Sequence, residues 1–222
     1  MEFGDFYTEP LREDTIDEAL RLCDIYLGQG IHSRSYLQSI LCDKHHHFDF
    51  IRYSSRAARG PHAIAEADAL AGICYCYSGT ASQISQGICI PRETILEVAG
   101  TKQTSPDDPE QEVLYGACRS VALLEEFRGT GLSRALLMAY SDAMFREDGI
   151  AAAFGVAWIR GNVVPADAQF KACGFSRICT ISRPWSRIEG LSCPECQHQP
   201  CICDGILYAK TRQVYLTENL EG

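Results

Sequence analysis

A glycine-rich turn between a predicted strand and a predicted helix is the feature that most constrains this chain of 222 residues. The strand is predicted over 116–124 (GACRSVALL), the turn reads EEFRGTG, and an amphipathic helix follows over 132–148. Gly129 and Gly131 remove side chains that would block a close approach to the backbone, and the first N–H groups of a helix have no partner within it. These donors and the helix dipole favour a bound pyrophosphate.

Two common phosphate-binding motifs do not account for this turn. No Gly-Lys-Ser/Thr follows it, which excludes a Walker loop, and Arg134 stands where the dinucleotide-binding fingerprint requires its third glycine. Arg128 and Arg134 add positive charge beside the turn. From this local sequence alone, an ordinary strand-to-helix turn is an alternative.

Helices and strands are predicted on both sides of the turn. Residues 14–27 and 33–42 have helical spacing, and Ser33 is the expected N-cap of the second helix. Residues 151–159 form an uninterrupted apolar run, which is typical of a strand buried on both faces. Further strands are predicted at 48–53, 68–78, 175–183 and 205–216, a further helix within 162–173, and a polar loop for the histidines at 45–47. Without a repeat or a clear linker, we expect one α/β (α+β) domain over 1–222, with a cysteine-rich insertion at 190–206.

The charge balance disfavours several kinds of partner. The chain has 20 Lys and Arg against 29 Asp and Glu, a net charge of −9, which opposes nonspecific binding to nucleic acid or an anionic membrane. No apolar run reaches the roughly 18 residues that span a bilayer, and the acidic N-terminus lacks the features of a secretory signal. We therefore expect a cytoplasmic protein with no nucleic-acid or membrane partner, and we leave a homodimer open.

Two motifs resemble those of the GNAT superfamily of acyl-CoA-dependent N-acetyltransferases. The segment 128–133 (RGTGLS) resembles the Q/R-x-x-G-x-G/A motif, with Ser133 in the place of the last small residue. Family members often carry an asparagine after the buried strand and then Y-x-x-x-G-F, and this chain has Asn162 followed by FKACGF at 170–175. The order of predicted elements is also similar over 5–216. The resemblance implies a mixed, mostly antiparallel sheet flanked by helices.

The resemblance also implies which residues bind acetyl-CoA. The backbone groups of Ala122 and Leu123, flanked by Val121, would pair with the pantetheine arm as an added strand. Asn162 would contact the cofactor or hold apart the two strands that admit it. The pyrophosphate would be held by the backbone N–H groups of the turn and the first helical residues, Gly129, Thr130, Gly131, Leu132, Ser133 and Arg134.

The acid and base of such a reaction are only partly indicated by the sequence. A carboxylate often serves as the base in this family, and Glu125 is our candidate because it directly follows the strand, with Glu126 and Glu112 as alternatives. A tyrosine in the second motif often protonates the leaving sulfur, but Phe170 stands at that position and cannot donate. Since a thiolate is a tolerable leaving group, activity does not require this acid. Substitute donors are Cys173, Tyr208 and Tyr215.

Four of the 12 cysteines lie close together near the C-terminus. Cys193, Cys196, Cys201 and Cys203 have the spacing C-x2-C-x4-C-x-C, which suits a tetrahedral zinc ion with a structural role. An iron–sulfur cluster and a redox pair are alternatives, and His198 could replace one cysteine as a ligand. A catalytic zinc is disfavoured because four thiolates leave no open position.

The sequence thus predicts an enzyme that moves an acetyl group from acetyl-CoA to a primary amine of an unidentified small-molecule or protein acceptor. One alternative is an N-acyltransferase with a longer acyl donor, of the acyl amino acid or signal-synthase type. Another is a noncatalytic module that binds acyl-CoA or a protein, which Phe170 mildly favours. The acceptor itself cannot be identified from the sequence, because a fold alone does not define a substrate.

Overall fold

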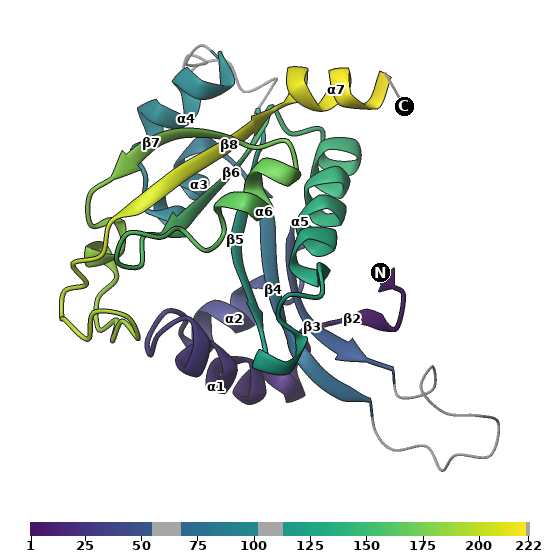
Figure 1. Cartoon of the computed structure of the whole chain (residues 1–222), viewed down its shortest axis with the longest axis vertical. Coiled ribbons are helices and arrows are strands. Elements are labelled where there is room, and N and C mark those ends of the chain that lie inside the picture. The colour runs from purple at the N-terminus through teal and green to yellow at the C-terminus, as the bar shows by residue number, and fades with distance from the viewer. Residues whose placement is uncertain (55–67, 102–112, 221–222) are drawn as a thin grey trace.

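A computed structural model describes residues 1–54, 68–101 and 113–220, and these form one continuous eight-stranded sheet with helices on both faces (Figure 1). The strands are β1 (Glu2–Phe3), β2 (Phe6–Pro10), β3 (His46–Tyr53), β4 (Ala69–Gly79), β5 (Tyr115–Leu123), β6 (Ala152–Trp158), β7 (Ser176–Ile181) and β8 (Gly205–Thr211). Their order is β1-β2-β3-β4-β5-β6-β8-β7. Only the β5–β6 pair is parallel, so the mostly antiparallel sheet that the resemblance implied is confirmed.

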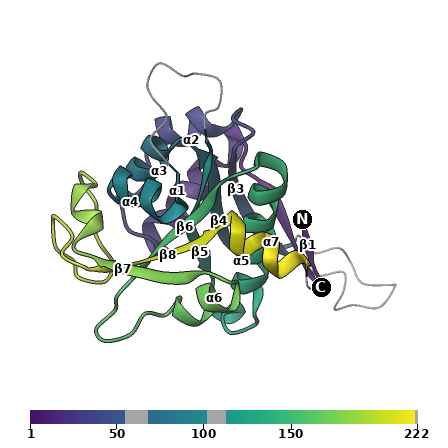
Figure 2. The same cartoon turned by 90° about the horizontal axis from the view of Figure 1, so that it is seen from above.

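Two layers of helices cover the sheet (Figure 2). One face packs against α1 (Ile16–Tyr26), α2 (Arg34–Ile40), α3 (Ala81–Ile88) and α4 (Arg92–Ala99). The other packs against α5 (Leu132–Ala143), α6 (Asp167–Ala172) and α7 (Arg212–Leu220). Short 3-10 turns are η1 (Glu13–Thr15), η2 (Glu125–Phe127) and η4 (Pro184–Arg187), and a π-helical turn (Met144–Asp148) extends α5.

The boundaries of several elements follow from local chemistry. The Ser33 side chain accepts a hydrogen bond from the N–H of Tyr36 at 3.1 Å, which confirms the predicted cap of α2. Gly149 ends the α5 region in the left-handed conformation, at φ 69°, as expected of a C-terminal glycine. None of the helices in the described parts of the chain is long and apolar enough to cross a membrane.

Two predictions about elements were wrong, and four elements were not predicted. The last predicted strand stops at Thr211, and α7 begins at Arg212, because residues after 211 leave the sheet and pack Tyr215 on Phe145. His46 and His47 belong to β3 rather than to a polar loop, since they pair with Tyr77 and Cys76 of β4. Helices α3 and α4 and strands β1 and β2 were not predicted, because their apolar patterns are short.

The parallel pair β5–β6 opens into a split. The two strands pair only at Gly116–Ala153 and Ala117–Phe154, after which they diverge. A bulge in β5 lies where the pairing stops: Tyr75 pairs with Ser120 and Cys76 with Cys118, so Arg119 is an extra residue without a partner in the β4–β5 ladder. Because a bulge bends its strand and re-aims a side chain, it turns β5 away from β6 at this point.

Candidate functional site

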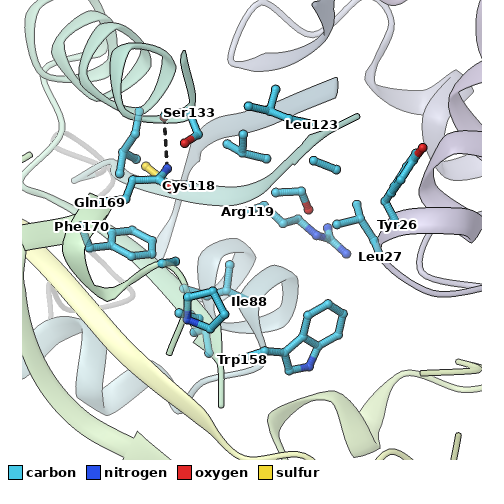
Figure 3. Close-up of a pocket in the computed structure, with 18 of the residues that line it drawn as sticks. Tyr26, Leu27, Ile88, Cys118, Arg119, Leu123, Ser133, Trp158, Gln169 and Phe170 are labelled. Carbon is cyan, nitrogen blue, oxygen red and sulfur yellow. Dashed lines mark hydrogen bonds between the residues drawn. The ribbon is translucent and has the colours of Figure 1, made fainter. Parts of the chain in front are cut away.

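A cavity of about 510 Å³ lies in the split between β5 and β6. Residues from both helical layers line it, so the cavity passes through the sheet. Ser133 and Gln169 come from one face, and Tyr26 and Leu27 come from the other (Figure 3). A site of this shape can bring a ligand on one face of the sheet into contact with a ligand on the other.

The glycine-rich turn forms one end of the cavity. Gly129 has φ 75° and Gly131 has φ 82°, both in the left-handed region, and a β-carbon on either would meet no other atom within 4 Å. The space beside both glycines, at the start of α5, is therefore open. The Thr130 hydroxyl donates to the Phe127 carbonyl at 2.9 Å and holds the turn in shape. Open space, exposed N–H groups and a helix N-terminus together suit a pyrophosphate.

The exposed edge of β5 offers backbone groups to the cavity. The Leu124 N–H donates to the Ala71 carbonyl on β4 at 2.9 Å. Because polar groups alternate between the two edges of a strand, Ala122 also directs its groups to β4. Val121 and Leu123 direct theirs to the opposite edge, where β6 has diverged. Val121, Ala122 and Leu123 were expected to pair with an extended ligand. Val121 and Leu123 direct backbone groups to the open edge where such a ligand would lie, whereas Ala122 does not.

Arg128 and Gln169 hold the walls near the turn. The Arg128 Nε donates to the Leu123 carbonyl at 3.1 Å, which leaves the Leu123 N–H and both groups of Val121 for a ligand. The Gln169 amide donates to the Ser133 carbonyl at 3.1 Å and ties α6 to the first turn of α5 (Figure 3).

The candidate proton donors Cys173, Tyr208 and Tyr215 do not line the cavity, whereas Phe170 lines it and has no polar atom. The Tyr208 hydroxyl lies in the core and donates to Asp167 at 2.6 Å. Tyr215 donates to Asp142 at 2.6 Å. Burial raises the pKa of Cys173 to about 11, and its thiol points to the Arg134 carbonyl at 3.6 Å.

The structure does not bring the predicted base or Asn162 into the cavity. Glu125 and Glu126 are exposed in η2, and neither lines the cavity. Glu112 lies outside the described residues. Asn162 is exposed in a tight turn between Arg160 and Val163. Among the lining residues there is no carboxylate in the described parts of the chain.

A chain of hydrogen-bonding side chains leads from the cavity wall to the surface. The Arg119 Nη1 donates to the Tyr36 hydroxyl at 3.1 Å, and the hydroxyls of Tyr36 and Tyr75 are 2.5 Å apart. The Tyr75 hydroxyl lies 2.7 Å from the His46 Nδ1, and the His46 Nε2 is 3.8 Å from Asp43 at the surface. Burial lowers the pKa of His46, against the opposing charge of Asp43, so that its imidazole is neutral at pH 7 and can accept a proton.

Sequence reasoning missed three prominent lining residues. Arg119 stands in the cavity, where Figure 3 shows it between the two ends. Trp158 and Trp185 form part of the wall, with ring centroids 4.8 Å apart. Arg119 could have been singled out from the sequence, because it is the one charged residue in the otherwise uncharged strand 116–124. No sequence pattern points to the two tryptophans, since they come together only through the fold.

The four cysteines near the C-terminus form a second candidate site. Their sulfur atoms all lie within 4.8 Å of one another. The Cys193–Cys203 and Cys196–Cys201 pairs are each 3.8 Å apart. Four bonds of about 2.3 Å to a tetrahedral zinc would place the sulfurs about 3.8 Å apart, whereas a disulfide requires about 2.05 Å. Two of the sulfur pairs therefore already have the spacing of a tetrahedral zinc site, and the whole donor set is compact enough to surround one ion.

Ionisation is favoured at one of the four cysteines and opposed at two others. Burial raises the pKa of Cys201 to about 11 and raises the pKa of Cys203 well above its usual value. Although burial opposes ionisation, the backbone N–H groups of Ile202 and His198 lower the pKa of Cys196 to about 6. The His198 imidazole is exposed and faces the Cys196 carbonyl. It is not part of the group of ligand atoms, so the four cysteines alone make up the set.

This cluster packs directly against the cavity. Trp158, Trp185, Ile188 and Ile31 contact the cysteine loop and also line the cavity. The loop after α1 is joined to it as well, because the Ser192 N–H donates to the Gln29 carbonyl at 2.9 Å. A ligand that held the cysteines would thus also hold one wall of the cavity.

Neither a protein-family model nor a curated protein sequence matches the chain, but solved structures do. The fold is similar to that of NAA60 from Arabidopsis thaliana in complex with acetyl-CoA, with a TM-score of 0.57, 12% identity, and coverage of 93% of this chain and 99% of that one. It is also similar to spermidine N-acetyltransferase from Vibrio cholerae in complex with CoA and spermine, with a TM-score of 0.55, 10% identity, and coverage of 96% and 99%.

A third similar structure is Arabidopsis thaliana Naa50 in complex with the bisubstrate analogue CoA-Ac-MVNAL, with a TM-score of 0.56, 13% identity, and coverage of 93% and 99%. The chain therefore has the GNAT fold, and the resemblance seen in its two motifs is confirmed at the level of the fold. At these identities the comparisons establish the architecture alone.

Proposed function

We propose that this protein is an N-acetyltransferase that moves the acetyl group of acetyl-CoA to a primary amine of a small-molecule or protein acceptor. The observation that carries the proposal is the cavity in the β5–β6 split, which joins the open glycine-rich turn on one face to an apolar pocket on the other. We further propose that residues 1–222 work as one domain, with the cysteine loop at 190–206 forming part of the cavity wall.

Acetyl-CoA supplies the activated acetyl group, and this chain supplies a place for each of its parts. The backbone N–H groups from Gly129 to Arg134 would hold the pyrophosphate at the start of α5. The open groups of Val121 and Leu123 would satisfy the pantetheine amides, which otherwise lose their water partners. Phe170 forms an apolar wall that excludes water from the reacting end of the cavity.

The acceptor ammonium must lose a proton before its nitrogen can react, and no described carboxylate lines the cavity to take it. We assign this role to the chain of Tyr36, Tyr75 and His46. Tyr36 does not itself line the cavity; it is bonded to Arg119, which does, so a water molecule would carry the proton from the amine to Tyr36. The proton of Tyr36 would pass to Tyr75 and on to the His46 Nδ1, and the His46 Nε2 would release a proton at the surface beside Asp43. Each hydroxyl both donates and accepts, so the chain needs no buried charge at rest.

We propose one structural zinc ion per chain, held by Cys193, Cys196, Cys201 and Cys203. The ion would neutralise thiolates that otherwise repel one another and would lock the loop that contacts Trp158 and Trp185. Because four sulfurs fill a tetrahedral site, zinc would take no part in the chemistry.

Calorimetry with acetyl-CoA tests the cofactor site. Gly131→Trp places a bulky group in the open space before α5, and we expect its affinity for acetyl-CoA to fall by about tenfold or more, because backbone approach is blocked. Gly149→Trp is the matched control: φ is 69° there, its β-carbon also meets no atom within 4 Å, and it lies at the other end of the same helical segment.

The outcomes separate the competing functions. Equal affinity of the folded Gly131→Trp protein and the wild type would show that acetyl-CoA does not bind at this turn. Tight acetyl-CoA binding without acetylation of any amine would favour a binding module. Native mass spectrometry of the purified protein would reveal a longer acyl donor by the mass of the bound CoA species.

A further inference from the structure

The cavity has an apolar end away from the glycine-rich turn, here called the acceptor end. Its walls come from α1 and the loop after it, from α3, from the end of β6 and from the segment around η4. Figure 3 shows Tyr26, Leu27 and Trp158 on this side, opposite Ser133 and Gln169. The lining side chains are Tyr26, Leu27, Ile31, Ile88, Trp158, Trp185 and Ile188. An amine acceptor that meets the acetyl group from this end therefore contacts aromatic and aliphatic surface.

Arg119 brings a positive charge to the cavity, between the glycine-rich turn and the acceptor end. The β5 bulge places its half-buried side chain over the rings of Tyr36 and Tyr75, at 5.4 Å and 5.7 Å from their centroids. Its Nη1 donates to the Tyr36 hydroxyl at 3.1 Å. In the described parts of the chain, no carboxylate forms an ion pair with Arg119.

The other two arginines of the cavity differ from Arg119. Arg128 is bonded to the Leu123 carbonyl near the turn, where it faces the proposed pyrophosphate. Arg160 is 3.6 Å from Glu195 and lies over the ring of Trp158. Within the described residues, Arg119 is thus the cavity arginine that has neither a carboxylate partner nor a place beside the glycine-rich turn.

Arg119 lacks a carboxylate partner among the described residues, although the chain as a whole has a net charge of −9. A half-buried guanidinium in an apolar cavity is costly unless an anion accompanies it. Its planar fork binds a carboxylate through two parallel hydrogen bonds. The missing anion is therefore expected on the ligand, on the same side of the sheet as the amine.

We infer that the acceptor is a free amino acid with an apolar or aromatic side chain, whose carboxylate binds Arg119. This rests on the acetyl transfer proposed above and names its substrate class. The side chain would lie against Leu27, Ile31 and the tryptophan pair, and the amine would point to the acetyl group. The nitrogen bonds to the acetyl carbon as the carbon–sulfur bond breaks. The ammonium gives one proton to solvent through the Tyr36 chain and one to the leaving sulfur.

The same features disfavour two other amines. A polyamine such as spermine carries several positive charges, which Arg119 would repel and which no described lining carboxylate would balance. The N-terminus of a peptide has no carboxylate on its α-carbon, so it would leave Arg119 unpaired inside the cavity. Both classes serve as comparison substrates in the test.

The experiment compares L-leucine, leucinamide and spermidine with the purified full-length protein. Acetylation is followed by the release of CoA thiol, and binding of each amine to the CoA-loaded protein is measured by calorimetry. We expect wild-type kcat/KM and affinity for leucine to exceed those for leucinamide by about 10- to 100-fold, the range for hydrogen bonds between charged groups. Arg119→Gln should remove this preference, whereas Arg160→Gln should retain it.

Each outcome decides the inference separately from the proposed function. Preference for leucinamide or spermidine, or a leucine preference that survives in folded Arg119→Gln protein, overturns the amino acid acceptor while acetyl transfer stands. If no amine is acetylated, the proposed function fails, and the calorimetric comparison still decides whether Arg119 selects a carboxylate. If Arg119→Gln does not fold, the ratio of leucine to leucinamide affinity in the wild type is decisive, and a ratio near one overturns the inference.

Discussion

The rings of Phe170 and Tyr208 stack face to face, with centroids 4.6 Å apart and planes 6° apart. Phe170 lines the cavity, and the buried Tyr208 lies behind it with its hydroxyl bonded to Asp167. Burial raises the pKa of Tyr208 well above its usual value. The stack therefore presents an apolar ring to the cavity and keeps the neighbouring hydroxyl out of it.

This stack predicts the effect of restoring a tyrosine. The Cζ atom of Phe170 would lie 2.5 Å from a β-carbon on Gly155, so the para position faces the backbone of β6. A hydroxyl added there is crowded, and we expect Phe170→Tyr to lower the free energy of unfolding by about 1–3 kcal/mol with no gain in kcat. Thermal unfolding and steady-state kinetics measure both, and Tyr208→Phe is the control that removes a hydroxyl outside the cavity. A clear rise in kcat for Phe170→Tyr would show that a missing acid limits the native protein.

His32 predicts an acid-sensitive fold. Burial, followed by the charge of Arg119, lowers its pKa to about 3, and neither ring nitrogen has a hydrogen-bond partner among the described residues. On acidification, His32 takes up a proton in the unfolded chain near pH 6.5 but in the folded protein only near pH 3. The contribution of His32 to the free energy of unfolding is therefore complete above pH 6.5 and declines as the pH falls toward 3. Between pH 7 and pH 5 the loss from this residue is about 2 kcal/mol.

His32→Phe keeps the ring that stacks on Tyr36 and removes the titration. We expect the variant to be at least as stable as the wild type at pH 7, because the substitution removes two buried ring nitrogens that have no hydrogen-bond partner among the described residues. Urea unfolding at both pH values should show a smaller loss on acidification than in the wild type. Equal losses in the two proteins would mean that His32 takes up no proton on unfolding in this range.

The proton chain predicts a specific kinetic defect. Tyr75→Phe interrupts the path between Tyr36 and His46, and we expect kcat to fall by about 100-fold, a typical size for positioned acid–base groups. The KM for acetyl-CoA should not change. Tyr77→Phe is the matched control, since this ring stacks on Tyr75 but its hydroxyl lies outside the chain. Equal kcat values for the two variants would exclude the path.

The cysteine cluster predicts a link between metal content and acceptor binding. Elemental analysis should find about one zinc per chain, and less than about half an equivalent would contradict the site. Cys201→Ser should loosen the wall formed by Trp158 and Trp185, and we expect the KM for the amine to rise by about tenfold or more, because a small misplacement is costly in a reacting geometry.

The affinity for acetyl-CoA should stay the same in this variant, since the turn at Gly129–Gly131 lies at the other end of the cavity. Cys42→Ser, an exposed cysteine outside the cluster, is the control. An unchanged KM for the amine in zinc-free Cys201→Ser protein would show that the cluster stabilises its own loop and not the acceptor wall.

Local chemistry alone was enough to predict several parts of this protein. The glycine turn before α5, the Ser33 cap and the buried strand β6 could be predicted, because each depends on neighbours within a few residues. The cysteine cluster was predicted for the same reason, since its four ligands fall in one short loop. Two short motifs, at 128–133 and 170–175, carried the resemblance to the GNAT superfamily for the same reason.

The acceptor end depended on contacts between distant segments. Gly28 ends α1 as its sequence predicts, but a β-carbon there would lie 2.9 Å from the Ser192 carbonyl, a contact between segments more than 160 residues apart. Trp158 meets Trp185, and Arg119 meets Tyr36, only because the sheet brings their elements together. Local sequence determined the turn, the caps and the cysteine cluster, because short-range sterics and hydrogen bonds specify them. The tertiary structure alone decided which charge stands in the cavity, because burial and long-range packing place Arg119 there with no carboxylate partner among the described residues.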